Sequence, residues 1–300
     1  MTKPGVFMLF WDFDTQWGVD RYSNPRARIP NRGLLDFVNT ERLLELHAEY
    51  GIPACFAVVG AAALPGARPY HDPELIRRIH QAGHEVASHS FQHDWLPGLG
   101  RVALRQTLSR SKDALEQCIG APIVSFVPPY NRPGDYPPGW AFSLLERRAG
   151  HQDRTNLTRL CETLAECGYR FSRISYRSLF RKLLILAGKR NWEVPVEPQH
   201  ISGITCLRLN TPDDFGNQTH RMVQLCAERG GFAVVYGHPL NLGSPDSQAE
   251  AHLVELLKRV NQLRRGNQLT LLQPRDLVGN GQKTKPIPGC SSRVPSPQHE

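Results

Sequence analysis

Two aspartates separated by one residue, Asp12 and Asp14, follow a short apolar run near the start of the chain. Side chains two residues apart in a β-strand point to the same side, so these carboxylates would converge at the strand's carboxyl end. Two carboxylates so close together repel one another unless a cation or a proton lies between them. The alternative is an aspartate pair that makes turn hydrogen bonds after the strand, and this motif alone favours neither interpretation.

Two histidines, His89 and His93, lie four residues apart directly after another predicted strand. We expect them to begin a helical turn, on which side chains at positions i and i+4 can hold one ion. One carboxylate and two imidazoles leave coordination positions open for water, as in catalytic rather than closed structural zinc sites. A second pair with this spacing, His80 and His84, is interrupted by a glycine, and we expect a structural role for it.

Two further polar motifs also follow predicted strands. The Pro-Pro-Tyr loop contains Pro129, Tyr130, Asn131 and Arg132, and its prolines would hold the Tyr130 backbone N–H toward the other polar groups. Taken alone, such a segment is more often just a loop. His238 ends a late strand. A lone histidine is more often structural, but this one lies at the same layer of the expected fold as the other motifs.

Short apolar runs that alternate with amphipathic segments would position these motifs. We predict strands at 6–11, 53–59, 85–87, 123–126, near 169, 203–209, 232–236 and 269–272. We predict helices at 33–50, 72–81, 101–118, 139–148, 156–167, 217–228 and 248–264. Strands separated by helices pair in parallel with right-handed crossovers. The sequence therefore predicts an α/β fold, a distorted (β/α) barrel of six to eight parallel strands that spans residues 1–280.

Two segments depart from the alternating pattern. A basic insert near 173–200 holds six basic residues and no acid between 173 and 190. Within it, 176–190 predicts an amphipathic helix, which would suit an anionic membrane surface or, equally, packing on the barrel with a solvated basic face. Residues 281–300 are rich in Pro, Ser, Gly and Lys, so we expect a disordered tail.

Composition limits the partners and the compartment. The formal charge of +8 suits a phosphate-bearing partner, and no nucleic-acid motif accompanies it. Seven cysteines without a CxxC pair indicate reduced core residues rather than a disulfide frame. The first residues lack the apolar stretch of a secretory signal, and no apolar run is long enough to cross a bilayer. We expect a cytoplasmic protein, which would contact the inner membrane face peripherally if the 176–190 helix binds membrane rather than the barrel.

The four motifs, in this order and at strand ends, resemble those of the polysaccharide deacetylase family (NodB-like, carbohydrate esterase family 4), especially its cytoplasmic Asp-x-Asp branch. The resemblance runs from about residue 6 to 277 and implies a NodB-like deacetylase barrel. It implies that Asp14, His89 and His93 hold a divalent metal, first of all zinc, although cobalt, iron, nickel or manganese fit the same ligands. The implied enzyme is a metal-dependent hydrolase of carbon–nitrogen bonds other than peptide bonds.

The resemblance also implies roles for the remaining motif residues. Asp12 would be the general base, the Tyr130 backbone N–H would stabilise the oxyanion, and His238 would protonate the departing amine. Two features depart from the family pattern. Many members carry an arginine before Pro-Pro-Tyr that orients the base, whereas this chain has Val127, so that Arg132 or another residue would take over that role. The acidic partner of the late histidine has two candidates, Asp153 and Asp213.

The implied reaction removes an acetyl or formyl group from an N-acylated amino sugar used in the synthesis of cell-envelope polysaccharide or glycolipid. The basic charge favours a sugar linked to a nucleotide or to a lipid phosphate. Two alternatives remain at this point. The same metal site could hydrolyse a cyclic amide or imide, and the barrel could be a non-catalytic pseudoenzyme that binds sugar.

Overall fold

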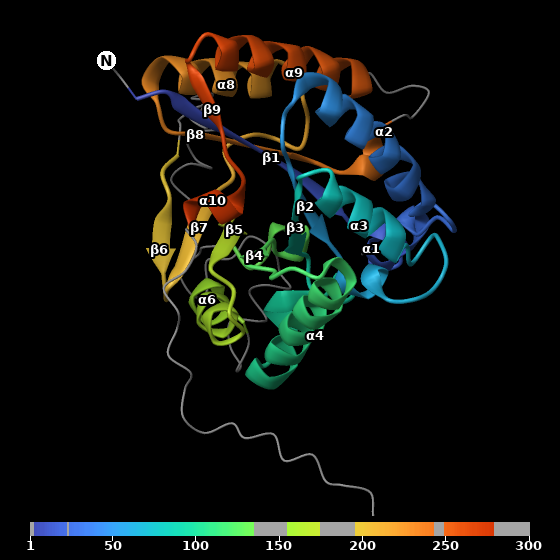
Figure 1. The fold of residues 1–300 in the computed structure, drawn as a ribbon. Helices are drawn as coiled ribbons and strands as arrows, with labels where there is room; N and C mark the ends of the chain where they lie inside the picture. Colours follow the sequence, from blue (N-terminus) through green and yellow to red (C-terminus); the bar gives the residue numbers. More distant parts are fainter. Residues whose placement is uncertain (1–2, 23, 135–154, 175–195, 243–248, 279–300) are drawn as a thin grey trace, which may run out of the picture.

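The computed structural model describes residues 3–22, 24–134, 155–174, 196–242 and 249–278. Their strands form one sheet in the order β6-β7-β5-β4-β3-β2-β1-β8, with β9 beside the start of β1 (Figure 1). All neighbouring strands pair in parallel except β6, which is antiparallel to β7. The strands are β1 (Gly5–Phe13), β2 (Cys55–Val58), β3 (Glu85–Ser88), β4 (Ser125–Phe126), β5 (Phe171–Ile174), β6 (Gln199–Ile201), β7 (Ile204–Arg208), β8 (Phe232–Gly237) and β9 (Leu269–Leu271).

The sheet curls until its two edges meet at one point. Val196, just before β6, exchanges two backbone hydrogen bonds with Phe232 at the start of β8, with N···O distances of 3.2 and 2.9 Å. The predicted distorted α/β barrel is therefore confirmed, and its sheet contains eight parallel strands within the described part of the chain.

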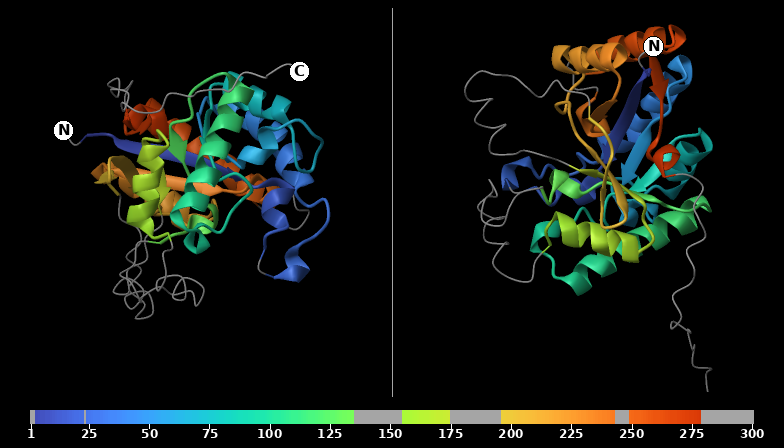
Figure 2. Two further views of the ribbon diagram at one scale, coloured as in Figure 1. Left: turned by 90° about the horizontal axis from the view of Figure 1, so that it is seen from below. Right: turned by 90° about the vertical axis from the view of Figure 1, so that its left-hand side faces the viewer.

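Helices cover the outer face of this sheet, as the two views in Figure 2 show. The longer ones are α2 (Leu34–Tyr50), α3 (Pro73–Gln81), α4 (Arg101–Ile119), α6 (Leu157–Glu166), α8 (Asn217–Arg229) and α9 (Ala249–Arg265). The shorter elements are α1 (Thr15–Val19), α10 (Pro274–Leu277) and the 3-10 turns η1 (Pro25–Ala27), η2 (Gly60–Ala63), η3 (Leu96–Gly98), η4 (Pro129–Asn131) and η5 (Pro239–Asn241).

Strand β1 divides the apolar core into an outer and an inner part. Alternate side chains of β1, among them Leu9 and Trp11, belong to the large cluster under the helices. Met8 and Phe10 belong to the second cluster, which fills the barrel interior. Because side chains alternate along a strand, the residue after Trp11 faces the interior as well. Each fully buried aromatic or aliphatic side chain contributes about 1.5–3 kcal/mol to stability, so both faces of β1 are strongly fixed.

The sequence missed one strand and misplaced another. A single strand was expected at 203–209, but the chain forms the β6–β7 hairpin, whose turn has positive φ at Ser202 and Gly203. The strand expected near 169 begins at Phe171, two residues after the buried Tyr169, whose hydroxyl donates to the Leu108 carbonyl. The expected helices at 139–148 and 176–190 and the expected tail at 281–300 lie outside the described residues. No helix among the described residues is both long enough and apolar enough to cross a membrane.

Candidate active site

Strand β1 delivers two carboxylates to one end of the barrel. Asp12 is the second-to-last residue of β1 and lies on the interior side of the sheet. Asp14 follows as the residue before α1. Each residue is only 3% exposed. The predicted convergence of these carboxylates at the carboxyl end of the strand thus matches their observed position.

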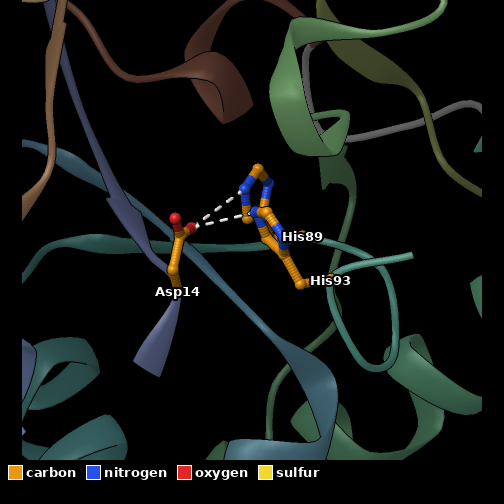
Figure 3. A group of neighbouring side chains, drawn as sticks. All are labelled: Asp14, His89 and His93. Atoms are coloured by element: carbon orange, nitrogen blue, oxygen red, sulfur yellow. Dashed lines mark ion pairs between the residues drawn. The ribbon is translucent and has the colours of Figure 1, made fainter. Parts of the chain in front are cut away.

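The Asp14 carboxylate faces two imidazoles (Figure 3). Its Oδ1 lies 3.3 Å from His89 Nε2 and 3.4 Å from His93 Nε2. His89 Nδ1 lies 2.7 Å from the Val127 carbonyl, to which it can only donate, so its Nε2 presents a lone pair to Asp14. Asp14 Oδ1 is buried and makes no hydrogen bond. An acceptor that faces two imidazole nitrogens in this way fits a bound cation, and these three residues form the one candidate metal cluster in the described chain.

The two histidines do not lie on a helical turn, as the i and i+4 spacing had suggested. They lie on a tight turn after β3, in which Ser90 and His93 have positive φ angles of 60° and 56°. The Ser90 hydroxyl accepts a hydrogen bond from the Asp94 N–H at 2.7 Å, and the Ser90 carbonyl accepts one from the backbone of η2. The turn is therefore anchored by the Ser90 hydroxyl and by η2, and in this conformation both imidazoles face Asp14.

Asp12 is held by an arginine that the sequence analysis did not identify. Arg173 of β5 donates two hydrogen bonds to it, from Nη1 to Oδ1 at 2.8 Å and from Nη2 to Oδ2 at 2.6 Å. Arg173 is fully buried, and its guanidinium lies over the rings of Phe10 and Tyr236. Burial opposes ionisation of Asp12, but the charge of Arg173, the charges of His89 and His238, and the hydrogen bonds from Arg173 together hold the pKa of Asp12 below its usual value.

This arginine is the first residue of the predicted basic amphipathic insert near 173–200, and the helix expected at 176–190 lies outside the described residues. Arg173 is an interior strand residue, and residues 199–201 at the other end of the insert form β6. The bidentate partner of Asp12 is therefore Arg173 and not Arg132.

His238 directly follows β8 and lies beside the two carboxylates of β1. Its Nε2 lies 3.9 Å from both Asp12 Oδ2 and Asp14 Oδ2, and its Nδ1 lies 3.0 Å from Asp213 Oδ2. Burial opposes protonation, but the hydrogen bond to Asp213 and the charges of Asp14 and Asp12 raise the pKa of His238 to about 10. Of the two acidic partners considered, Asp213 is in contact, and Asp153 lies outside the described residues.

Comparisons with known proteins agree with this architecture. Residues 36–137 match the family model for polysaccharide deacetylase. A chitooligosaccharide deacetylase from Sinorhizobium fredii is 36% identical over 94 residues, which cover 31% of this chain and 41% of that protein. The fold resembles the crystal structure of a putative polysaccharide deacetylase from Mycobacterium smegmatis, with a TM-score of 0.55, 20% identity, and coverage of 91% of this chain and 94% of that one.

These matches support the polysaccharide deacetylase superfamily for the first half of the chain, and the fold is similar over most of its length. The matched region contains the histidine turn and the Pro-Pro-Tyr loop, whereas Asp12, Asp14 and His238 lie outside it. The match spans less than half the length of the curated relative, so that relative's activity does not transfer directly to this chain.

The Pro-Pro-Tyr loop contacts both the candidate metal cluster and the arginine that holds Asp12. The Tyr130 ring packs on His93 with a centroid distance of 4.5 Å, and Asn131 Oδ1 accepts from Arg173 Nη2 at 2.9 Å. Tyr130 and Asn131 both have positive φ, which turns the backbone sharply at this point. Pro129 is buried, and Arg132 follows in extended backbone. The loop is thus fixed beside the candidate metal cluster and the arginine fork.

A second residue that the sequence analysis missed is Asp36 on α2. It is fully buried, and its carboxylate accepts hydrogen bonds from the Thr15 N–H at 2.7 Å and the Leu240 N–H at 2.8 Å. Burial and the nearby charge of Asp14 raise the pKa of Asp36 to about 8. One side chain therefore joins the segment after Asp14 to the segment after His238. The hydrophobic pattern of α2 gave no signal for this role.

Proposed function

We propose that this protein is a metal-dependent deacetylase that hydrolyses the N-acyl bond of an amino sugar. The observation that carries the proposal is the cluster of Asp14, His89 and His93 with an arginine-held carboxylate on one side and an aspartate-paired histidine on the other. The superfamily and the similarity to a chitooligosaccharide deacetylase support the same class of reaction.

The metal would be held by Asp14 Oδ1 and by the Nε2 atoms of His89 and His93. These ligands suit zinc first, and cobalt, iron, nickel or manganese as well. A divalent ion bound there would lower the pKa of water and polarise the acyl carbonyl. The hydrogen bond from His89 to the Val127 carbonyl keeps the ligating nitrogen of that histidine unprotonated.

The residues around the cluster would carry the proton transfers. Asp12, kept ionised and oriented by Arg173, would take a proton from the attacking water as its oxygen bonds to the acyl carbon. The Tyr130 backbone N–H would stabilise the resulting oxyanion. His238, paired with Asp213, would then protonate the amine as the carbon–nitrogen bond breaks, which releases the free amino sugar and acetate or formate.

The substrate would be an N-acetyl or N-formyl amino sugar with an anionic carrier, either a nucleotide or a lipid phosphate, used in envelope polysaccharide or glycolipid synthesis. The formal charge of +8 supports an anionic carrier, because arginine and lysine attract phosphate groups.

Metal-stripped protein, supplied again with zinc or cobalt, provides the test. The expected result is metal-dependent release of acetate or formate from N-acyl amino sugars, with phosphate-linked sugars hydrolysed faster than neutral chitin oligomers. Small cyclic imides serve as competing substrates in the same assay. Hydrolysis of the imides alone would replace the proposal with cyclic imide hydrolysis. Metal binding with no hydrolysis of any of these compounds would favour a sugar-binding pseudoenzyme.

A further inference from the structure

Exposed apolar side chains gather on one short stretch of the chain. Six large apolar residues are exposed in the described part of the protein, and four of them lie within ten residues. Ile29 is 50% exposed, Leu34 40%, Leu35 42% and Val38 50%. The last three lie on the first turns of α2, where residues three and four apart are neighbours on the helix surface. Contiguous exposed apolar side chains usually mark an interaction surface.

The charges around these side chains are positive. Arg26 and Arg28 are exposed, Arg32 is half-buried, and none of the three forms an ion pair with a described residue. Three acids lie nearby, and each has a partner: Glu41 on α2 forms an ion pair with Arg68. Asp36 is buried against backbone N–H groups, and Asp20 accepts hydrogen bonds from neighbouring side chains. The stretch therefore presents aliphatic groups and arginines without an ion pair in the described part of the chain.

This stretch is attached directly to the candidate active site. The Gln16 side chain, two residues after Asp14, accepts from the Gly33 N–H at 3.0 Å and donates to the Ile29 carbonyl at 3.3 Å. The Tyr130 hydroxyl donates to the Arg21 carbonyl at 3.1 Å. In the left view of Figure 2, the blue segment that carries η1 projects beyond the body of the molecule. The exposed groups thus lie on an extension beside the site, and not on a remote face.

We propose that Ile29, Leu34, Leu35 and Val38, together with Arg26 and Arg28, form a docking patch for an anionic membrane surface. Aliphatic side chains that insert at the headgroup boundary, flanked by arginines that meet anionic lipids, are the two contributions that hold peripheral proteins on membranes. A protein partner is less favoured by this composition, because protein interfaces concentrate aromatic anchors and the six patch residues include none.

The docking patch bears on which carrier the amino-sugar substrate is attached to. This step rests on the proposed function, and it selects the lipid-phosphate-linked amino sugar over the nucleotide-linked one. Docking through the patch would place the barrel end with Asp12, Asp14 and His238 next to the membrane surface, where the headgroup of a lipid-linked sugar lies. A nucleotide sugar diffuses freely and needs no such surface.

Sedimentation of the whole protein with vesicles tests the patch without any substrate. At low salt, the protein is expected to sediment with phosphatidylserine-containing vesicles and not with pure phosphatidylcholine, and added salt should release it. The double variant Ile29→Glu/Val38→Glu should lower the partition coefficient about tenfold or more, because two inserting side chains become charged. Arg26→Glu should lower it by at least about fivefold.

Matched substitutions elsewhere give the controls. Val102 on α4 is 72% exposed and Arg229 on α8 is exposed, so Val102→Glu and Arg229→Glu change the same kinds of side chain at other sites. Both should bind vesicles like the wild type. Wild-type protein that ignores anionic vesicles, or equal loss in patch and control variants, would overturn the proposal. A third outcome would also overturn it: the protein is a dimer in size-exclusion chromatography, the double variant is a monomer, and neither binds vesicles. The patch would then join two copies of the chain.

Hydrolysis of a soluble acetyl ester keeps the two proposals separate. The patch variants should retain this activity, because none of the substituted residues touches the candidate metal cluster. Vesicle binding by a protein that hydrolyses nothing would leave the docking patch standing and remove the deacetylase. Full hydrolysis without vesicle binding would leave the deacetylase standing and remove the docking patch.

Discussion

Two pairs of buried histidines lie at nearly the same separation on opposite faces of the sheet. The ring centroids of His89 and His93 are 5.1 Å apart, and those of His47 and His84 are 5.0 Å apart. The first pair lies at the carboxyl end of the barrel beside Asp14, and the second lies under the helices against the outer core. Separation alone therefore does not distinguish a candidate metal site from a structural cluster.

The difference lies in what faces the ring nitrogens. In the outer pair, the Trp11 indole N–H donates to His47 Nε2 at 2.8 Å, and the Ala54 N–H donates to His84 Nδ1 at 3.1 Å. In the inner pair, both Nε2 atoms face the same carboxylate oxygen of Asp14. A nitrogen that already accepts an N–H has no lone pair left for a metal, whereas converging acceptors need a cation.

The largest expected effect follows from removing one imidazole of the inner pair. His89→Ala or His93→Ala should lose both bound metal and activity, because two remaining protein ligands hold a divalent ion poorly. His84→Asn is the control from the outer pair, since its amide oxygen can still accept from the Ala54 N–H. It should keep its metal. Mass spectrometric metal content and initial rates provide the measurements, and normal metal in both alanine variants would remove the site.

The next effect separates metal binding from proton transfer. Asp12→Asn cannot accept a proton from water, so turnover should fall roughly a hundredfold or more. Its metal content should stay near that of the wild type, because Asp12 is not part of the Asp14, His89 and His93 cluster. Rates and metal content measured on one preparation decide the assignment, and normal turnover would show that Asp12 is not the base.

A smaller loss of rate is expected from the residue that holds the base. Arg173→Met removes both hydrogen bonds to Asp12 and should lower kcat by roughly tenfold to a hundredfold with little change in bound metal. Val127 and Phe10 belong to the same interior cluster, on the side of the sheet that Asp12 faces. Val127→Arg in the Arg173→Met background should therefore restore part of the rate. Unchanged kcat in Arg173→Met would contradict a positioning role.

The sequence predicted the parts of the site that are local in the chain. Asp12 and Asp14 share a side because side chains alternate along a strand, and the histidine turn follows directly from β3. The sequence did not predict the local shape of that turn, because the i and i+4 spacing of His89 and His93 fits a helix and a tight turn with positive φ equally well.

The supporting contacts depend on the arrangement of the whole sheet. Arg173 is 161 residues from Asp12 in the chain, and it reaches Asp12 across the interior because the sheet curls. Asp36 is 204 residues from Leu240, one of its two hydrogen-bond partners. Hydrophobic periodicity indicates which residues are buried, but not which buried polar groups meet. Only the candidate acid for His238 was foreseen, as one of two choices.

The last expected effect concerns the outer histidine pair, and it appears in stability rather than in rate. Burial, with the neighbouring charge of His84, lowers the pKa of His47 to about 3, and burial, with the charge of Arg275, lowers the pKa of His84 to about 4. The unfolded chain protonates both histidines near pH 6.5. Unfolding therefore takes up protons below about pH 6.5, and the contribution to stability is lost as the pH falls to about 4 for His84 and to about 3 for His47.

Urea unfolding at about pH 7.5 and about pH 5 measures this contribution. The loss from His84 alone should be on the order of 3 kcal/mol at the acid limit and less at pH 5. Glu85 and Asp36 have raised pKa values of about 7 and 8, so their contributions change in the opposite direction over the same range. Comparison with the double variant His47→Gln/His84→Asn cancels those carboxylates and isolates the histidines. If the wild type and the double variant lose equal stability on acidification, the outer pair is not the buried neutral cluster described above.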